Sequence, residues 1–365
     1  LSKISNDMFT TISRPNAKPI FYNGDMAVAQ RSASTASITN NGYHTVDRIK
    51  TFNDTMGTWT QSQSTTVPSG QGFATSLKMD CTTADASPAV GDRLGIRQQF
   101  EGQNIQLLKY STSSAETTTL SFWVRSNKTG TYIVELYGPS TDRQISKSYT
   151  ISSADTWEKK TITFDGDTGG TYNNDNSNEL ILSWYLGAGT NYTSGTLSTT
   201  WGSSTNANRA VGQVNLADNT SNEWYITGVQ LEAGEFNSSS IPPFQHESFG
   251  DNLARCQRYY YQVTGTGKGR FTNGNFFDEN DGDVMVPFPC KMRAAYALSS
   301  SAVGDIIITS VSAEADCTAI ALDTSLSLDA ADVRFTVGSD IATIGHVSTM
   351  ILKDSGSYLA FDAEL

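Results

Sequence analysis

Charged residues are scarce in this 365-residue chain, making up 17% of it, against about 25% in an average soluble protein. Basic residues are the scarcer sign: 25 Lys and Arg stand against 37 Asp and Glu, for a formal net charge of −12. No run rich in Lys or Arg appears, and phosphate binding needs a concentrated positive surface. The sequence therefore argues against a nucleic-acid-binding protein.

Histidine and cysteine are also few, with three and four residues. The cysteines lie far apart and form no C-x-x-C pair, so the spacing of a zinc site is absent. No G-x-S-x-G element of a serine hydrolase occurs. We therefore expect no cofactor and no zinc site. We expect small, buried, apolar roles for the cysteines, with a disulfide pair as the alternative; they are Cys81, Cys256, Cys290 and Cys317.

Long apolar runs are missing as well. No stretch approaches the roughly 20 apolar residues that span a bilayer, and the N-terminus lacks the basic-then-apolar layout of a signal peptide. We therefore expect a soluble chain. Because it begins with Leu1 rather than Met, we expect it to be a processed product, a fragment or the end of a longer polypeptide.

Ser, Thr, Asn and Gly fill the place of the missing charge, a profile typical of β-rich extracellular proteins. Between 20 and 232, roughly ten short segments alternate polar and apolar residues or are apolar throughout, separated by turn clusters. The clearest is "TTLSFWVRS", where Leu120, Phe122 and Val124 share one face. This pattern predicts a mainly β protein built on a jelly-roll β-sandwich.

One connection in this region has the form of a hairpin. The segment "TTLSFWVRS" is followed by the turn "NKTG" and then by the second strand-like segment "GTYIVELYG". Two strand patterns joined by so short a turn predict an antiparallel β-hairpin.

The chain divides into three predicted parts. Residues 1–19 are polar and contain two prolines, which suits a connecting arm. Residues 20–245 form the jelly roll, and residues 246–365 form a smaller C-terminal β-domain. A helix at about 249–260 introduces this second domain.

The helix has its own sequence signals. Ser248 offers an N-cap, and four apolar residues follow at spacings of four, three and four, which places them on one helix face. That face, predicted to be buried, consists of Phe249, Leu253, Cys256 and Tyr260.

Two long polar loops lie at 165–179 and 187–213, and loops of that size in a β-domain are either disordered or functional. We take them as the predicted binding region. Sugar sites pair exposed aromatic rings with polar donors and acceptors. Trp123, Trp157 and Trp224 lie in regular strands and are expected to support the core. The candidate carbohydrate-binding residues are Trp59, Tyr172, Trp184, Tyr185, Tyr192 and Trp201.

Acidic residues offer two further hypotheses. The loop "DENDGD" at 278–283 concentrates oxygen ligands but fails the register of an EF-hand, so it is a turn between two strands or a structural calcium site. Glycan cleavage would need two carboxylates about 5 to 9.5 Å apart. The acidic residues are plentiful, and sequence spacing does not show which of them converge.

Three stretches resemble the C-terminal region of bacteriophage tail-fibre and related virion fibre proteins, especially those of marine phages. They are "FYNGDMAVAQRSAS" with "GYHTVDRIK", then "EWYITGVQLEAGEFNSSSIPPFQHESFGDNLARCQRYYY", and finally "VPFPCKMRAAYAL" with the terminal "FDAEL". In the first stretch Ile49 and Ser32 stand where the family usually has Trp and Gly, and in the third Tyr296 stands where it has Pro.

The resemblance implies a virion fibre or receptor-binding protein, assembled in the host cytoplasm, whose jelly roll is similar to carbohydrate-binding modules. It also implies a homotrimer, partners among tail or adaptor proteins, and a host surface polysaccharide as ligand. We expect recognition without enzymatic activity. The alternatives are a purely structural virion component, such as a head fibre, decoration or tail protein, and a polysaccharide depolymerase.

Overall fold

The computed structural model describes residues 19–365 except 312 and 324–326, so the arm predicted at 1–19 lies almost wholly outside the described residues. The chain forms two compact units: one runs through Asn252 and includes Leu365, and the other is Leu253–Glu364. The division falls inside helix α2 (Phe249–Gln257), whereas the sequence analysis placed it ahead of the helix, at 245/246. No helix of the described residues is long and apolar enough to cross a membrane.

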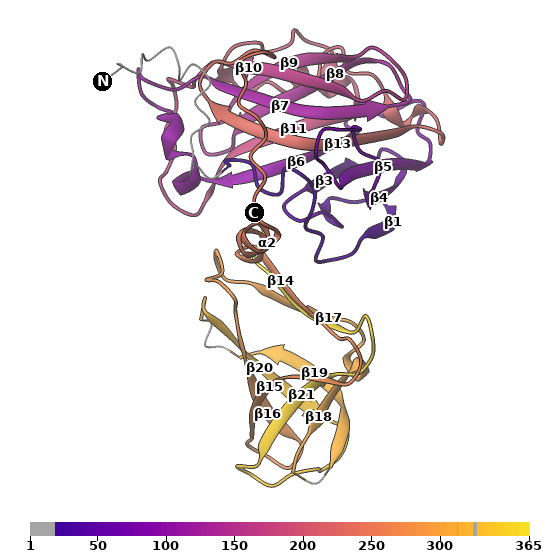
Figure 1. Ribbon diagram of the computed structural model, residues 1–365, viewed down its shortest axis with the longest axis vertical. Helices are drawn as coiled ribbons and strands as arrows, with labels where there is room; N and C mark the ends of the chain where they lie inside the picture. The colour runs from indigo at the N-terminus through magenta and orange to yellow at the C-terminus, as the bar shows by residue number, and fades with distance from the viewer. Residues whose placement is uncertain (1–18, 312, 324–326) are drawn as a thin grey trace, which may run out of the picture. The chain divides into compact units, whose positions relative to one another are not determined.

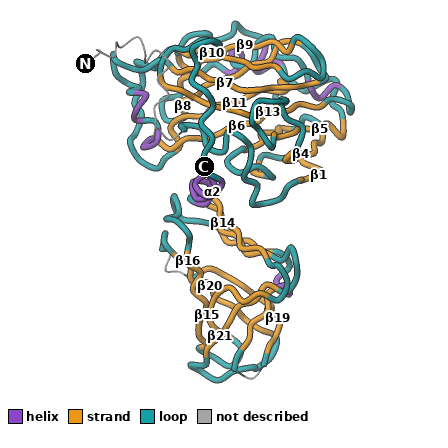
Figure 2. The backbone as a smooth tube through the Cα atoms, in the orientation of Figure 1, coloured by secondary structure: helices purple, strands orange, loops and turns teal. Residues whose placement is uncertain are grey.

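The first unit is a sandwich of two antiparallel sheets, as predicted (Figures 1 and 2). The six-stranded sheet has the order β1 (Ser34–Ile38), β4 (Thr58–Ser64), β5 (Ser76–Thr83), β13 (Glu223–Ala233), β7 (Thr118–Ser126) and β10 (Glu158–Phe164). The seven-stranded sheet has the order β12 (Gly202–Ser203), β9 (Arg143–Ile151), β8 (Gly130–Gly138), β11 (Asn178–Ala188), β6 (Arg93–Glu101), β3 (Lys50–Asp54) and β2 (Gly42–Tyr43). One short helix, α1 (Thr190–Thr193), follows β11.

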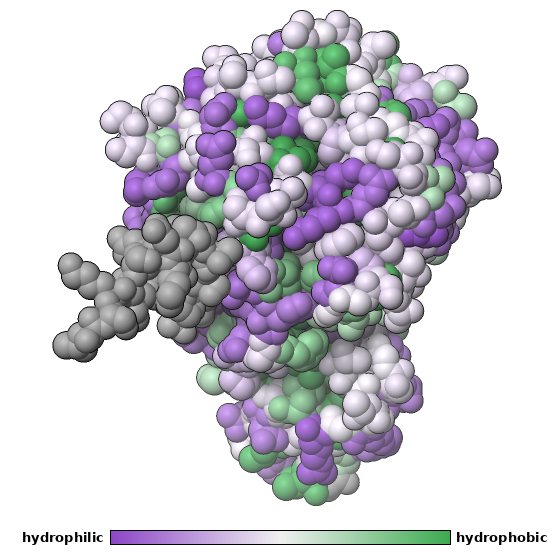
Figure 3. Space-filling model, turned by 45° about the horizontal axis from the view of Figure 1, so that its top comes forward, coloured by the Kyte–Doolittle hydropathy of each residue, from purple (hydrophilic) through white to green (hydrophobic). Residues whose placement is uncertain are grey.

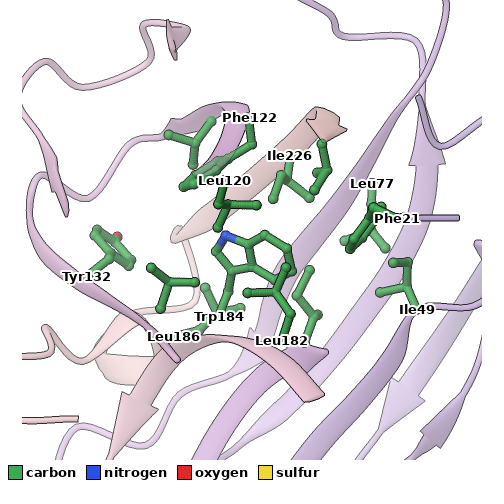
Figure 4. Packing of buried hydrophobic residues seen from close by; sticks show 14 of the residues in the cluster. Phe21, Ile49, Leu77, Leu120, Phe122, Tyr132, Leu182, Trp184, Leu186 and Ile226 are labelled. Carbon is green, nitrogen blue, oxygen red and sulfur yellow. The ribbon is translucent and has the colours of Figure 1, made fainter. Parts of the chain in front are cut away.

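The core lies between these two sheets. Successive residues of a strand point to opposite faces, so Leu120, Phe122 and Val124 of β7 all turn inward and are fully buried, which confirms the predicted alternation. Trp184 of β11 lies amid the core side chains, with Leu120, Phe122 and Ile226 around it (Figure 4). Burial of such apolar surface supplies the main favourable free energy of folding.

The predicted hairpin between β7 and β8 is wrong. β7 pairs with β10 and β13 in the six-stranded sheet, whereas β8 pairs with β9 and β11 in the seven-stranded sheet. The turn at 127–129 therefore carries the chain across the sandwich. Both strands alternate because each buries one face in the same core, from opposite sides, and the sequence pattern is the same as that of a hairpin.

The second unit contains a closed barrel and a small sheet. The barrel has the order β15 (Gly269–Phe276), β16 (Asp281–Pro287), β20 (Ala330–Val337), β19 (Glu314–Leu322), β18 (Ile306–Thr309) and β21 (Val347–Leu352). The three-stranded sheet has the order β14 (Tyr260–Thr264), β22 (Tyr358–Asp362) and β17 (Ala297–Ser300). This confirms the smaller C-terminal β-domain. The acidic loop at 278–283 includes the turn between the paired strands β15 and β16.

Helix α2 begins as predicted but buries a different face. Ser248 caps it: its Oγ accepts the amide hydrogen of Asp251 at 3.2 Å and donates to the Asp251 carboxylate at 2.6 Å. Phe249 is 61% exposed, so its assignment to the buried face is wrong. Cys256 and Tyr260 are buried as predicted, Leu253 is half-buried, and Asn252 and Tyr259 are buried in addition.

The four cysteines are free thiols. Cys81, Cys256 and Cys317 are buried, as predicted, and Cys290 is half-buried. The disulfide alternative is therefore not realised.

Candidate functional site

Three of the predicted sugar-binding aromatics are buried. Trp59 and Trp184 have no exposed surface and belong to the sandwich core, and Tyr185 is 1% exposed. A ring that offers no face to solvent cannot stack on a sugar. These three assignments are therefore corrected: they support the fold.

Tyr172 and Trp201 do come together, around Tyr110. The ring centroid of Tyr110 lies 5.4 Å from that of Tyr172 and 5.8 Å from that of Trp201, both in edge-to-face geometry. The indole nitrogen of Trp201 donates a hydrogen bond to the Asp165 carbonyl oxygen at 2.7 Å. Tyr172 and Trp201 are half-buried and pack against the core, so this aromatic cluster closes one part of the sandwich and keeps part of its surface in solvent.

A buried carboxylate fixes the loop that carries Tyr172. Asp167 has no exposed surface, and its oxygens accept hydrogen bonds from Arg143 Nε at 3.0 Å and from the Tyr172 hydroxyl at 2.8 Å. Burial and the Asp167 charge raise the pKa of Tyr172 well above its usual value. The tyrosine therefore remains a neutral donor, and we interpret Asp167 as an anchor for the loop.

Tyr192 lies elsewhere, in the loop at 187–213. It packs with Leu197 against a small cluster formed by Phe52, Ile133, Tyr185 and Ala210, and the guanidinium of Arg93 lies 5.2 Å from its ring centroid. The loop thus folds over the outer face of the seven-stranded sheet, the face that points away from the sandwich core. This cluster explains why Tyr185 is covered.

The rest of that outer face carries a row of polar residues on neighbouring strands. Arg97 of β6 is directly opposite Ser183 of β11, and Ser183 is directly opposite Glu135 of β8. The next row along contains Gln99, Ile181 and Tyr137 in the same way. Opposed residues of antiparallel strands have Cβ atoms about 5 Å apart. We call the surface formed by Arg97, Gln99, Ser183, Glu135, Arg209 and Tyr137 the Arg97 face.

An ion pair holds the loop to this face. Glu135 is fully buried and accepts hydrogen bonds from Arg209 Nε at 2.8 Å and Arg209 Nη2 at 2.6 Å. The same guanidinium lies 4.6 Å from the ring centroid of Tyr137. Burial alone would lower the pKa of Arg209, but the attraction of the Glu135 charge outweighs it. The pKa of Arg209 is therefore raised above its usual value. The pair links the 187–213 loop to strand β8.

Arg97 differs from the other arginines of this surface. Its side chain is half-buried and lies 5.8 Å from the Phe52 ring centroid, and its Nε is buried without a hydrogen-bond partner among the described residues. Ser183 and Gln99 beside it are each 5% exposed. The Arg97 face therefore offers a largely dehydrated cation next to a hydroxyl and a carboxamide.

The sequence analysis overlooked this face although its signal is present. In "RLGIRQQFE", Leu94, Ile96 and Phe100 alternate with Arg93, Arg97 and Gln99, so the polar set shares the face opposite the core. The loops attracted attention because of their aromatic residues. The strand alternation locates the polar row equally well.

The outer face of the six-stranded sheet carries a polar groove of about 610 Å³ beside β10. Its lining comes from Lys159, Thr161, Thr163 and the segment Glu235–Ser238. Trp123 is half-buried and points to this outer face by strand alternation. Trp157 is half-buried, precedes β10 and packs against Tyr225. The assignment of both to the core is therefore wrong, whereas Trp224 is fully buried as predicted.

In the view of Figure 3, hydrophilic and near-neutral residues cover most of the surface and hydrophobic residues form small patches between them. Among the described residues, no group of three or more His, Cys, Asp or Glu side chains could hold a metal ion.

No protein-family model and no curated protein matches the sequence. Similar solved structures include the enzymatically active domain of tailspike protein 4 from bacteriophage CBA120, at 13% identity and a TM-score of 0.31, over 59% of this chain and 21% of the tailspike chain. The matched part of this chain thus spans about a fifth of that domain's chain.

Two carbohydrate-binding modules are also similar. One is the family 11 module from Clostridium thermocellum, in complex with a β-1,3-1,4-mixed-linked tetrasaccharide, at 12% identity and a TM-score of 0.27, over 56% of this chain and 98% of the module. The other is TmCBM61, in complex with β-1,4-galactotriose, at 8% identity and a TM-score of 0.30, over 60% of this chain and 99% of that one. At such low identities, the ligands of these proteins are properties of those proteins and are not transferred to this chain.

Proposed function

We propose that the protein recognises a glycan through the Arg97 face. The observation that carries this proposal is the half-buried Arg97, whose Nε has no hydrogen-bond partner among the described residues, on the same outer sheet face as the half-buried ring of Tyr137. Sugars present hydroxyl edges and apolar CH faces, which polar side chains and aromatic rings recognise together. Regular strands hold such groups more rigidly than loops do.

The wider role in this proposal is that of a phage tail fibre or receptor-binding protein that attaches the virion to a host surface polysaccharide. The three fibre-like sequence stretches support it, in particular the long segment that contains "QLEAGEF" and "ARCQRYYY". In this role the chain is a homotrimer joined to other tail or adaptor proteins, and it performs no chemistry. Several identical weak sites then gain affinity from multivalent attachment.

The binding test uses the full chain on a glycan array and on intact host cells. We expect a defined subset of glycans to bind, and we expect Tyr137→Ala to weaken binding by about tenfold, the value of an aromatic contact of about 1.4 kcal/mol. Trp123→Ala is the matched control, since Trp123 is a half-buried strand aromatic on the other sheet. Equal losses in both variants, or no glycan binding at all, would contradict the proposed site.

Separate measurements test the absence of enzymatic activity, the trimer and the location on the virion. Release of reducing ends from host polysaccharide would overturn the non-enzymatic assignment. Light scattering that gives a mass other than three chains would overturn the trimer. Immunolabelling of virions by electron microscopy locates the chain, and label on the capsid or no label on the tail would overturn the tail-fibre role.

A further inference from the structure

Arg97 stands out because no acidic group of the described residues pairs with it. Among the described residues the structure gives Arg97 no hydrogen bond and no ion pair, only the contact of its guanidinium with the Phe52 ring. A half-buried guanidinium has five N–H donors. Buried polar groups without partners are uncommon in folded proteins, because their dehydration is not compensated.

The acidic groups nearby are already bound to other arginines. Asp54 pairs with Arg93, and Glu135 accepts hydrogen bonds from Nε and Nη2 of Arg209. On the strand beyond β6, the residue directly opposite Arg97 is Lys50, whose Nζ donates to a main-chain oxygen of Leu365 at 3.1 Å. These neighbouring charged groups therefore bind one another, and among the described residues none of them forms an ion pair with Arg97.

The titration behaviour agrees with this picture. Burial, followed by repulsion from Arg93 and Arg209, lowers the pKa of Arg97. An arginine in a protein still keeps its proton at neutral pH. The charged form of Arg97 is thus present but less stable than it would be in water. A bound anion would stabilise that charge.

We propose that the ligand of the Arg97 face is an acidic glycan, whose uronate carboxylate or sulfate ester is bound by the Arg97 guanidinium. This inference rests on the proposed glycan-binding function and specifies its substrate class. The planar guanidinium can bind two oxygens of one acidic group at once. Ser183, directly opposite on β11, and Gln99, two residues along β6, supply neutral groups for the neighbouring sugar hydroxyls.

The spacing of the face suits one acidic sugar and its neighbour. Adjacent strands lie about 4.8 Å apart and every second residue of a strand about 6.8 Å apart, so Arg97 on β6 and Tyr137, two strands away on β8 and in the next row, are separated by roughly 12 Å. An acidic group bound at Arg97 thus directs the adjoining sugar ring diagonally across β11 toward Tyr137. Binding by such a charged contact weakens as salt is added.

The experiment compares matched acidic and neutral glycans on the full chain. The array carries uronate-containing polysaccharides, their carboxyl-reduced neutral counterparts, sulfated galactans and their desulfated counterparts. We expect binding to uronate or sulfated forms, with loss of at least about tenfold on carboxyl reduction or desulfation, the range of one hydrogen bond to a charged group. Which of the two treatments abolishes binding identifies the acidic group.

Variants then connect the effect to Arg97. Arg97→Met should reduce binding of acidic glycans by at least about tenfold, and Arg97→Lys should restore it in part because the charge returns without the planar fork. Arg125→Met is the control, since Arg125 lies over the Tyr225 ring on the other sheet. The urea midpoint of Arg97→Met should equal or exceed that of the wild type, because no native partner is lost.

The outcomes separate this inference from the function on which it rests. Preference for neutral glycans, with binding that Arg97→Met leaves unchanged, overturns the acidic ligand and keeps glycan recognition. Failure to bind any glycan overturns both. A lower urea midpoint in Arg97→Met shows that Arg97 serves the fold, and it also contradicts the inference.

Discussion

Replacing Glu135 by Gln should destabilise the first unit strongly. Glu135 is fully buried and receives two hydrogen bonds from Arg209, whose side chain is 12% exposed. The substitution keeps the shape of the side chain but removes its charge, which leaves the arginine buried without a counterion. Breaking a buried pair in this way costs about 3–5 kcal/mol.

The assay exploits the distribution of tryptophan. All six tryptophans occur by residue 224, within the first unit, so tryptophan fluorescence reports the unfolding of this unit in the full chain. For a unit of this size, a loss of 1 kcal/mol in the free energy of unfolding lowers the midpoint of thermal unfolding by about 2–4 °C. Glu135→Gln should therefore lower the midpoint of thermal unfolding by roughly 6–20 °C and lower the urea midpoint at an unchanged m-value.

Two comparisons make the result interpretable. Asp155 is 55% exposed and pairs with Arg125 at 2.8 Å, so Asp155→Asn should cost no more than about 1 kcal/mol. The double variant Glu135→Leu with Arg209→Met should recover most of the loss, since apolar replacement of a buried pair is often neutral. If Glu135→Gln costs no more than Asp155→Asn, the buried pair is not the restraint that the distances indicate.

Three further outcomes are expected. Trp184→Ala should cost about 3–5 kcal/mol in the same urea assay, because the ring is fully buried; a loss below 1 kcal/mol would contradict its place in the core. Cys81, Cys256 and Cys317 are buried and Cys290 is half-buried, so a thiol reagent at pH 8 should label one native cysteine, Cys290, and four after denaturation. Burial raises the pKa of Cys290, and it raises that of Cys81 to about 11 and that of Cys317 to about 12. Burial alone would raise the pKa of Glu223, but hydrogen bonds from its neighbours outweigh it and lower that pKa. The stability that Glu223 supplies is therefore present above its unfolded pKa and lost as pH falls through its folded pKa, so Glu223→Gln should be less stable than the wild type at pH 7 and equal to it in acid.

The fold was predictable because alternation is a local property. Leu120, Phe122 and Val124 occupy every second position, and that pattern alone identifies the buried face of a strand. The pairing of strands was not predictable in the same way. The turn after β7 is as short as a hairpin turn, yet the chain crosses to the other sheet there. Local turn chemistry sets the length of a connection, whereas partner choice depends on residues far away in the sequence.

The candidate site was predicted poorly for a related reason. Aromatic type was given more weight than strand position. Trp184 shares the inward face of its strand with Leu182 and Leu186 and is buried, whereas Trp123 lies between the inward-facing Phe122 and Val124 and is half-buried on the outer face. Tyr172 and Trp201 were found because the loops that carry them meet. Their common neighbour Tyr110 has no signal in the sequence that relates it to either loop.

The Arg97 face and the Glu135 pair are two parts of one electrostatic arrangement, and the same substitution acts on them in opposite directions. In Glu135→Gln the Arg209 charge is no longer neutralised, so the face gains one positive charge next to the row that contains Arg97. Association of an acidic glycan should then become faster at low salt, because opposite charges steer encounter, although the folded unit is less stable. A neutral ligand would show only the loss of stability. A faster association together with a lower stability therefore distinguishes a surface that recognises the charge of its ligand from one that recognises only its shape.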